Sequence, residues 1–313
     1  MALRIVIGDV TIGIQGQDFS YIFSVGCGGM ESLYKDGKEW LYRTPRPAFW
    51  RAVTDNDRGC GFAFRSAVWS AADRFVRCSR VEARMDGQEI AIPLAPANNQ
   101  YTGKETCDRF EIIYTYETPT VPATEVTVTY TVEAEGRIHV QADYHGKQGL
   151  PELPVFGMRL LMPTAAEGYT YEGLSGETYP DRMAGGIPGV YAVQGLPVTP
   201  YMVPQDCGMH MQTKWLEIVR KTSLDNTDRE GRSSRLKITA EEGKGFAFSC
   251  LPYTAQELEN AMHHEELPPA RRTVVSILGA VRGVGGINSW GADVEDTYHI
   301  SGEQDISYGF WIE

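Results

Sequence analysis

The sequence predicts an all-β protein made of large antiparallel sheets with few, short helices. Apolar and polar residues alternate with a period of two along several segments, which is typical of half-buried strands. The 313 residues include 33 glycines and 17 prolines, enough to supply many turns. They also include 16 Tyr, 11 Phe and 6 Trp, residue types that strands favour. We therefore expect residues 1–313 to form a single large β-sandwich.

The clearest strands form a predicted hairpin. Apolar residues occupy every second position of 126–132, with threonines between them, and the pattern resumes over 138–144 after the turn at Glu135-Gly136. Residues 110–116 and 306–312 alternate in the same way. Because the apolar residues share one face, the sheets should be antiparallel and covered on one side only.

Helical signals are few. Residues 62–76 contain several alanines and predict one helix. Thr254 and Glu257 have the spacing of a capping box and predict a second, which Pro268 and Pro269 should end. Residues 225–234 are polar and charged, and predict an exposed hairpin loop.

Composition excludes some functions. Hydrophobic residues make up 42% of the chain, sufficient for a sizeable core, and the net charge of −12 repels nucleic-acid phosphates. No apolar run approaches the roughly 20 residues that a membrane span needs. Residues 1–9 alternate like a strand and lack the features of a signal peptide. We therefore expect neither a nucleic-acid partner nor a membrane partner.

The cysteines indicate the compartment. Cysteines 27, 60, 78, 107, 207 and 250 are scattered, with no CxxC pair and no histidine at metal-ligand spacing. We expect reduced thiols, mostly small buried hydrophobes, and a cytoplasmic protein.

A sugar-binding surface is predicted near the C-terminus. Gly285 and Gly286 allow a tight turn, and Asn288 and Ser289 then lead to Trp290. An indole held at the tip of a glycine-flanked loop can pack on the apolar face of a pyranose. The alternative is that Trp290 closes the end of the core, since Trp is highly buried on average.

A second loop has two interpretations. Asp55-Asn56-Asp57 carries oxygen ligands that suit a hard cation, but the further ligands and the distal Glu of a calcium loop are missing. We favour a structural role in which these side chains accept hydrogen bonds from nearby backbone amides. Gly59 and Gly61 bracket a turn that can move, so the loop is also a candidate gate.

Other polar residues are assigned structural roles. Asp181 and Arg182 can bind a ligand hydroxyl, but such a pair more often holds an irregular loop. His210 stands alone at a turn, and the adjacent His263 and His264 do not match a zinc motif. Nothing marks the two carboxyl groups that glycoside hydrolysis requires. We therefore predict no catalytic residue in this chain.

Four segments, in order, resemble the small subunit of two-chain β-galactosidases. They are equally similar to the C-terminal β-sandwich domain of single-chain β-galactosidases of glycoside hydrolase family 2. The segments are Phe49 to Gly59, Gly173 to Arg182, Pro200 to Gln205 (through Pro200-Tyr201 and Pro204-Gln205) and Gly283 to Gly291. The likeness runs from about residue 5 to the end of the chain.

The resemblance implies a galactose-mutarotase-like supersandwich. It implies that the catalytic glutamates and the magnesium and sodium sites belong to the barrel of a separate large catalytic subunit, so this chain binds no cofactor. Trp290, beside Asn288 and Ser289, would stack on terminal β-D-galactosides such as lactose. The isolated chain should be inactive.

The resemblance also identifies Asp57, Arg58, Gly59 and Gly61 with a mobile loop that closes over galactose. The sequence departs from the common family pattern at Val53, where many members have Pro, and at Ile287-Asn288, where many have an Asp pair. Asp206 and its neighbours depart as well, so the resemblance gives Asp206 no special role.

Two other functions fit parts of this pattern. A free-standing galactoside-binding module would need only the Trp290 loop. An aldose epimerase is suggested by fold analogy alone, and it needs a His acid and a Glu base that the sequence does not identify.

Overall fold

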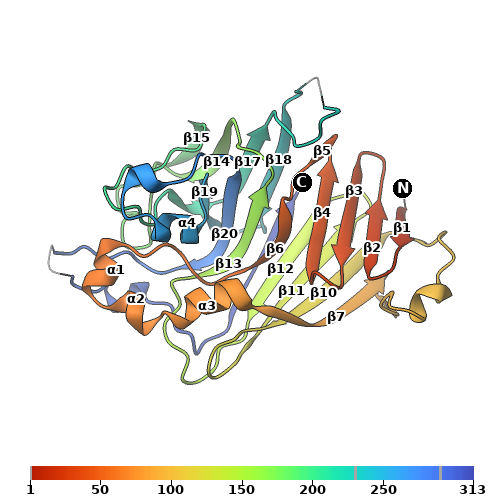
Figure 1. The fold of residues 1–313 in the computed structure, drawn as a ribbon, viewed down its shortest axis with the longest axis horizontal. Helices are drawn as coiled ribbons and strands as arrows, with labels where there is room; N and C mark the ends of the chain where they lie inside the picture. The colour runs from red at the N-terminus through yellow and green to blue at the C-terminus, as the bar shows by residue number, and fades with distance from the viewer. Residues whose placement is uncertain (1, 229–230, 289–290) are drawn as a thin grey trace.

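The computed structural model describes residues 2–228, 231–288 and 291–313. Antiparallel strands in three sheets dominate it, which confirms the predicted all-β class (Figure 1). The largest sheet has ten strands in the order β15-β14-β17-β18-β21-β12-β11-β10-β7-β8. Its strands are β7 (Arg77–Met85), β8 (Gln88–Ile90), β10 (Arg109–Glu117), β11 (Glu125–Glu133), β12 (Ile138–Tyr144), β14 (Gly168–Leu174), β15 (Pro188–Gln194), β17 (Trp215–Arg220), β18 (Ser234–Ala240) and β21 (Ile306–Ile312).

Two smaller sheets pack against the ten-stranded sheet. The six-stranded sheet has the order β5-β4-β3-β2-β1-β9, and the five-stranded sheet has the order β16-β19-β20-β13-β6. Their strands are β1 (Leu3–Ile7), β2 (Thr11–Gln15), β3 (Phe19–Ser24), β4 (Gly29–Lys35), β5 (Lys38–Glu39), β9 (Thr106–Cys107), β6 (Arg43–Ala48), β13 (Val155–Met162), β16 (Met209–Thr213), β19 (Phe246–Leu251) and β20 (Thr273–Val281).

Aromatic side chains join the layers. Phe23 of the six-stranded sheet contacts Phe110 and Tyr130 of the ten-stranded sheet, with ring centroids 6.0 and 5.6 Å apart. Phe156 of the five-stranded sheet likewise contacts Tyr144 and Tyr308. One connected cluster of buried residues therefore runs through all three sheets. Such a core explains why aromatic residues are so frequent in the sequence.

The predicted hairpin is confirmed. Strand β11 pairs with β12 from Val126↔Tyr144 to Val132↔Ile138, around Gly136 with φ of +85°. Val126, Val128, Tyr130 and Val132 are all buried. The apolar face that the alternation predicts is therefore the face that packs into the core.

The helices differ in part from expectation. The region 62–76 holds two helices, α2 (Phe62–Arg65) and α3 (Val68–Phe75), because the chain leaves the helical conformation at Ser66. The break buries Trp69 completely while Phe64 stays exposed. The alanine run that suggested one long helix is therefore divided between α2 and α3.

The second predicted helix begins as expected and ends early. Helix α4 (Ala255–Asn260) has the Thr254–Glu257 capping box, but it stops at Ala261, which turns extended and buries its side chain. Pro268 and Pro269 lie well beyond this end, so they do not terminate α4. The remaining helical turns are α1 (Asp55–Gly59) and 3₁₀ turns at Ala97–Gln100, His264–Glu266 and Asp296–Tyr298.

All six cysteines are unpaired. Cys107, Cys207 and Cys250 are buried, whereas Cys27 is exposed and Cys60 and Cys78 are half-buried. The expectation of mostly buried thiols is therefore correct for only half of them. In the described part of the chain, no helix combines the length and apolar character that crossing a membrane requires.

Candidate functional site

The four segments of the resemblance meet at one end of the molecule. The backbone N–H of Asp55 donates to Gln205 Oε1 at 2.9 Å, and Asn56 Nδ2 donates to the carbonyl of Val284 at 3.1 Å. The carboxylate of Asp181 accepts from the backbone of Val284 and Gly285. Figure 1 shows α1 beside the loop that follows β20. We call this assembly of segments 49–59, 173–182, 204–206 and 283–294 the loop cluster.

A buried ion network holds the loop cluster together. Arg51 binds Asp57 through two hydrogen bonds of 2.6 and 3.2 Å, and Arg282 Nη1 lies 3.4 Å from the same carboxylate. Arg51, Asp57 and Arg282 are at most 4% exposed. Arg282 also binds Glu152 and Asp293. Buried charges of this kind need such partners, so these contacts fix the relative positions of the segments.

The charge of Asp57 is stabilised despite its burial. Burial by itself would raise the pKa of this carboxyl, but Arg51 and the hydrogen bonds from Thr54 outweigh it and hold the pKa below its usual value. Asp57 therefore stays ionised at neutral pH. It serves as the shared counter-ion of two arginines.

Asp57 also starts helix α1. The hydroxyl of Thr54 accepts from the backbone of Asp57 at 3.1 Å, and the Asp57 carboxylate accepts from the backbone of Thr54 at 3.0 Å. This capping box replaces the looser turn expected for residues 55–57. Asp57 thus bonds to a nearby backbone amide as expected, whereas Asp55 pairs with Arg58 and Asn56 donates to the carbonyl of Val284. Among the described residues, no group of three or more His, Cys, Asp or Glu is placed to hold a metal ion.

Asp181 and Arg182 hold the loop after β20. Asp181 accepts hydrogen bonds of 3.0 and 2.8 Å from Val284 and Gly285, and Arg182 donates to the carbonyl of Gly285. Gly285 and Gly286 have φ of +71° and +83°, so the turn depends on glycine. The two side chains therefore anchor this loop, which is the structural role that the sequence favoured for them.

The loop returns against α1. A Cβ on Gly59 would lie 2.9 Å from the Cα of Gly291, so the two backbones touch. Arg65 of α2 binds Asp293 at 2.7 Å on the same side. The stem of the loop is thus held by α1 and α2 as well as by Asp181 and Arg182.

The structure places part of the predicted sugar surface. Asn288 Oδ1 accepts from the backbone of Ala292 at 3.2 Å, and Ile287 beside it is exposed. Ser289 and Trp290 lie outside the described residues. Of the residues predicted for the mobile loop, Asp57 is anchored in the ion network, while Arg58 is 40% exposed at the outer face of α1. The roles predicted for Trp290, Asn288 and Ser289 and for the loop of Asp57, Arg58, Gly59 and Gly61 stay predictions.

A second carboxyl beside Arg51 has the opposite pKa shift. Burial raises the pKa of Asp206 to about 6, against the opposing effects of Arg51 and of the Tyr179 hydroxyl, which donates to it at 2.8 Å. Acids with divergent pKa values are typical of glycosidase sites. However, the cavity that Arg51 and Asp206 line measures only about 20 Å³, room for one water molecule and no sugar. Asp206 therefore has no space for a sugar beside it, and Asp57 is bound by Arg51 and Arg282.

His210 is scaffolding, the role that the sequence favoured for it. His210 is buried against Phe248, and its Nε2 lies 3.1 Å from the Tyr169 hydroxyl. Burial lowers the pKa of His210 to about 4, so it is neutral at physiological pH. His263 Nδ1 instead pairs with Glu266 at 3.0 Å on the surface.

Sequence reasoning did not single out Arg282, Asp293 and Glu152. A signal for Arg282 was present, because it directly follows the apolar run of β20 and a cation there is buried at a strand end. Its need for a counter-charge was therefore visible. Which carboxylates supply that charge depends on contacts between distant segments.

Comparison with known proteins gives the family. The model of the β-galactosidase small chain matches residues 15–312. A β-galactosidase small subunit of Latilactobacillus sakei is 57% identical over 310 residues, covering 99% of this chain and 97% of that protein. A β-galactosidase of Streptococcus thermophilus is 33% identical over 313 residues, covering 99% of this chain but 28% of its own length.

Solved structures include a galactose mutarotase-like protein from Lactobacillus casei. It has 10% sequence identity and a TM-score of 0.41, with 97% of this chain and 99% of that chain covered. The family match over nearly the whole sequence and the small-subunit relative identify the chain. It belongs to the β-galactosidase small-chain family.

Proposed function

We propose that this chain completes the active site of a β-galactosidase whose catalytic glutamates lie on a separate large subunit. Single-chain β-galactosidases such as that of Streptococcus thermophilus match nearly all of this chain with 28% of their own length. The greater part of such an enzyme therefore corresponds to nothing in this chain. The partner is the large catalytic chain, and the magnesium and sodium sites belong to it.

The observation that carries this proposal is the convergence of the family segments in the loop cluster. Asp181, Arg182 and Asn56 hold the stem of the loop that bears Trp290. A loop held in this way can present one indole to a pocket on another chain. Stacking on a sugar contributes roughly 1–3 kcal/mol, enough to orient a substrate but too little for catalysis.

The residues then have distinct roles. Trp290, with Asn288 and Ser289 beside it, packs on the sugar. Arg58, Gly59 and Gly61 move over bound galactose, and Asp57 forms the fixed root of this loop. The reaction retains configuration through a covalent galactosyl-enzyme, which water or a second sugar resolves. Terminal β-D-galactosides such as lactose are the substrates, and the enzyme acts in the cytoplasm.

The first experiment measures cleavage of a chromogenic galactoside. The purified chain alone is expected to show no activity, and addition of the large subunit is expected to restore it. Hydrolysis by the pure small chain would overturn the assignment of the catalytic residues to a partner.

The second experiment replaces Trp290 by Ala in the assembled enzyme. KM for lactose should rise roughly tenfold, and transfer to a second sugar should fall more than formation of the galactosyl-enzyme. Trp290→Phe keeps a ring and should lose less, whereas Ile287→Ala, an exposed apolar change in the same loop, should leave KM unchanged. An unaltered ratio of hydrolysis to transfer would contradict the role of Trp290.

A free-standing galactoside-binding module makes a different prediction. Calorimetry of the isolated chain with millimolar lactose would then show binding that Trp290→Ala abolishes. Under our proposal the isolated chain binds no lactose in this range, because the loop cluster supplies only one side of the pocket.

A further inference from the structure

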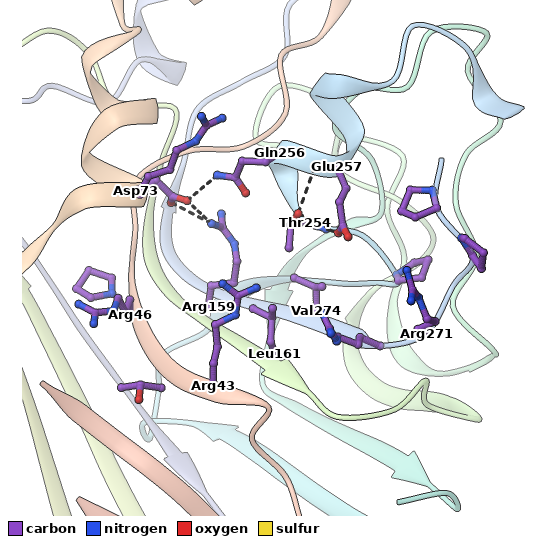
Figure 2. Close-up of a pocket in the computed structure, with 17 residues that line it drawn as sticks. Arg43, Arg46, Asp73, Arg159, Leu161, Thr254, Gln256, Glu257, Arg271 and Val274 are labelled. Atoms are coloured by element: carbon purple, nitrogen blue, oxygen red, sulfur yellow. Dashed lines mark hydrogen bonds and ion pairs between the residues drawn. The ribbon is translucent and has the colours of Figure 1, made fainter. Parts of the chain in front are cut away.

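A large cavity lies outside the ion network of the loop cluster. It is bounded by β6, α3, β13 and the segment from Pro252 to Val274 that contains α4, and its volume is about 560 Å³ (Figure 2). This volume is in the range of small-molecule sites in proteins, roughly 300–1,000 Å³. None of Arg51, Asp57 and Arg282 lines it. The cavity therefore adjoins the loop cluster at Phe49 and Trp50, which bond to Asp73, but it lies outside the ion network.

The charge of the cavity opposes that of the whole chain. Two carboxylates line it, Asp73 and Glu257, against six arginines. The protein as a whole has a net charge of −12. The arginines come from four separate parts of the sequence: Arg43, Arg46, Arg74, Arg159, Arg271 and Arg272. This concentration of positive charge arises from the fold and not from a basic run in the sequence.

Both carboxylates are already bound by the protein. Asp73 accepts two hydrogen bonds from Arg159, at 2.7 and 2.9 Å, one from Gln256 at 3.1 Å, and two from the backbone of Phe49 and Trp50. Glu257 accepts from the backbone and hydroxyl of Thr254 in the capping box of α4. Figure 2 shows these contacts at one wall of the cavity. They leave five arginines without either carboxylate as a hydrogen-bonded partner.

Several of these guanidinium groups are available to a ligand. In the part of the chain that the structure describes, Arg43 and Arg271 make no hydrogen bond or ion pair through their side chains. The guanidinium carbon of Arg272 lies 3.6 Å from the centroid of the Tyr42 ring. Stacking on a ring face leaves the N–H groups of a guanidinium free to donate to a ligand. Arg46 donates only to the neutral carbonyls of Val76 and Cys27. Among the described residues, Arg43, Arg46, Arg271 and Arg272 therefore have no carboxylate bound to them.

We propose that this cavity binds a small anion with at least two phosphate or carboxylate groups. Guanidinium groups bind both kinds of oxyanion through paired hydrogen bonds. Arg43, on β6, and Arg271, on the segment after α4, come from different walls (Figure 2). A ligand with two anionic groups contacts both arginines at once. Arg159 and Asp73 form the fixed floor, since Arg159 also donates to the carbonyl of Trp50.

Titration calorimetry of the full chain tests this site with two probes, pyrophosphate and citrate, at constant ionic strength. At least one probe should bind saturably with one ligand per chain. The double variant Arg43→Gln/Arg271→Gln should bind it at least tenfold more weakly, because each substitution removes a charge-assisted hydrogen bond. Tighter binding of pyrophosphate would indicate a phosphate ligand, and tighter binding of citrate would indicate a carboxylate ligand. Sodium chloride is the matched blank for charge screening.

The control variant is Arg235→Gln. Arg235 is an exposed arginine on β18 that pairs with Glu217 away from the cavity, so its loss should leave the affinity unchanged. Unchanged thermal unfolding shows that the double variant is folded, and Arg43 and Arg271 are both exposed. No saturable binding of either probe, or equal binding by the double variant, overturns the proposal. So does a double variant that only weakens association with the large subunit, because an acidic segment of the partner would then be the occupant.

Discussion

At the scale of single residues, the loop cluster depends on one carboxylate. Asp57 neutralises Arg51 and contacts Arg282, and these three side chains are almost inaccessible to water. A buried pair contributes little to stability compared with apolar residues, but the loss of one partner leaves a charge without compensation. The network is therefore more important for where the segments lie than for how stable the protein is.

Replacing Asp57 by Asn tests this network. The free energy of unfolding should fall by about 3–5 kcal/mol, because Arg51 stays buried without its anion, whereas Arg282 keeps Glu152 and Asp293. Asp55→Asn is the matched control: its carboxylate is 69% exposed and pairs with Arg58 at the surface, so the loss should stay below about 1 kcal/mol. Urea unfolding measures both. Equal losses in the two variants would mean that the ion network does not hold the loop cluster.

Asp206 should make stability depend on pH. An ordinary Asp titrates near about pH 3.9, and in the fold burial raises the pKa of Asp206 to about 6. Between these values the folded state binds more protons than the unfolded state, so this carboxyl contributes stability in acid that is lost as the pH rises. In Asp206→Asn this loss is absent. The difference in free energy of unfolding between the variant and the wild type should therefore shift by about 3 kcal/mol in favour of the variant from about pH 4 to pH 7. A difference that does not change with pH would show that Asp206 is ionised throughout.

At the scale of elements, the sequence predicted what is local. The alternation over 126–144 specified the β11–β12 hairpin, and the Thr254–Glu257 spacing specified the start of α4, because both signals act within a few residues. The break between α2 and α3 was missed, since it follows from burying Trp69 against distant residues. The partners of Arg282 were missed for the same reason. Long-range contacts decide these features, and a single sequence does not contain them as a pattern.

The close contact between α1 and the loop after β20 predicts that adding one methyl group at Gly59 changes the kinetics of the assembled enzyme. Gly59→Ala places a Cβ 2.9 Å from the Cα of Gly291, so α1 and the loop must separate. Such overpacking costs roughly 1–3 kcal/mol, and in the assembled enzyme we expect kcat to change severalfold. Gly185→Ala is the control, since a Cβ there meets nothing within 4 Å. Identical steady-state kinetics of both variants and the wild type would remove Gly59 from the moving loop.

At the scale of the whole molecule, the last strand joins two halves of the largest sheet. Strand β21 pairs with β12 on one side and with β18 on the other. Its side chains also reach the opposite layer, where the Tyr308 hydroxyl donates to the carbonyl of Ile277 at 2.8 Å. Without β21, β12 and β18 would each end in an unpaired edge.

Truncation after Asp305 should therefore abolish cooperative folding. Removal of β21 exposes two strand edges and the apolar face that it covers, which favours aggregation. Phe310→Ala is a graded version: this side chain is 1% exposed, and its truncation should cost about 3–5 kcal/mol. Ser307→Ala, on the exposed face of the same strand, should cost less than about 1 kcal/mol. A soluble truncated chain with a single sharp unfolding transition would show that the two halves of the sheet fold without β21.

The position of β21 also affects how the protein is made. The ribosome makes residues 306–312 after every strand that they must join, so the nascent ten-stranded sheet stays in two pieces until β21 has emerged. During that interval β12 and β18 are open to pairing with other newly made chains. Yield in a host cell should then be limited by how quickly β21 is made and paired, and slower, cooler expression favours the correct closure.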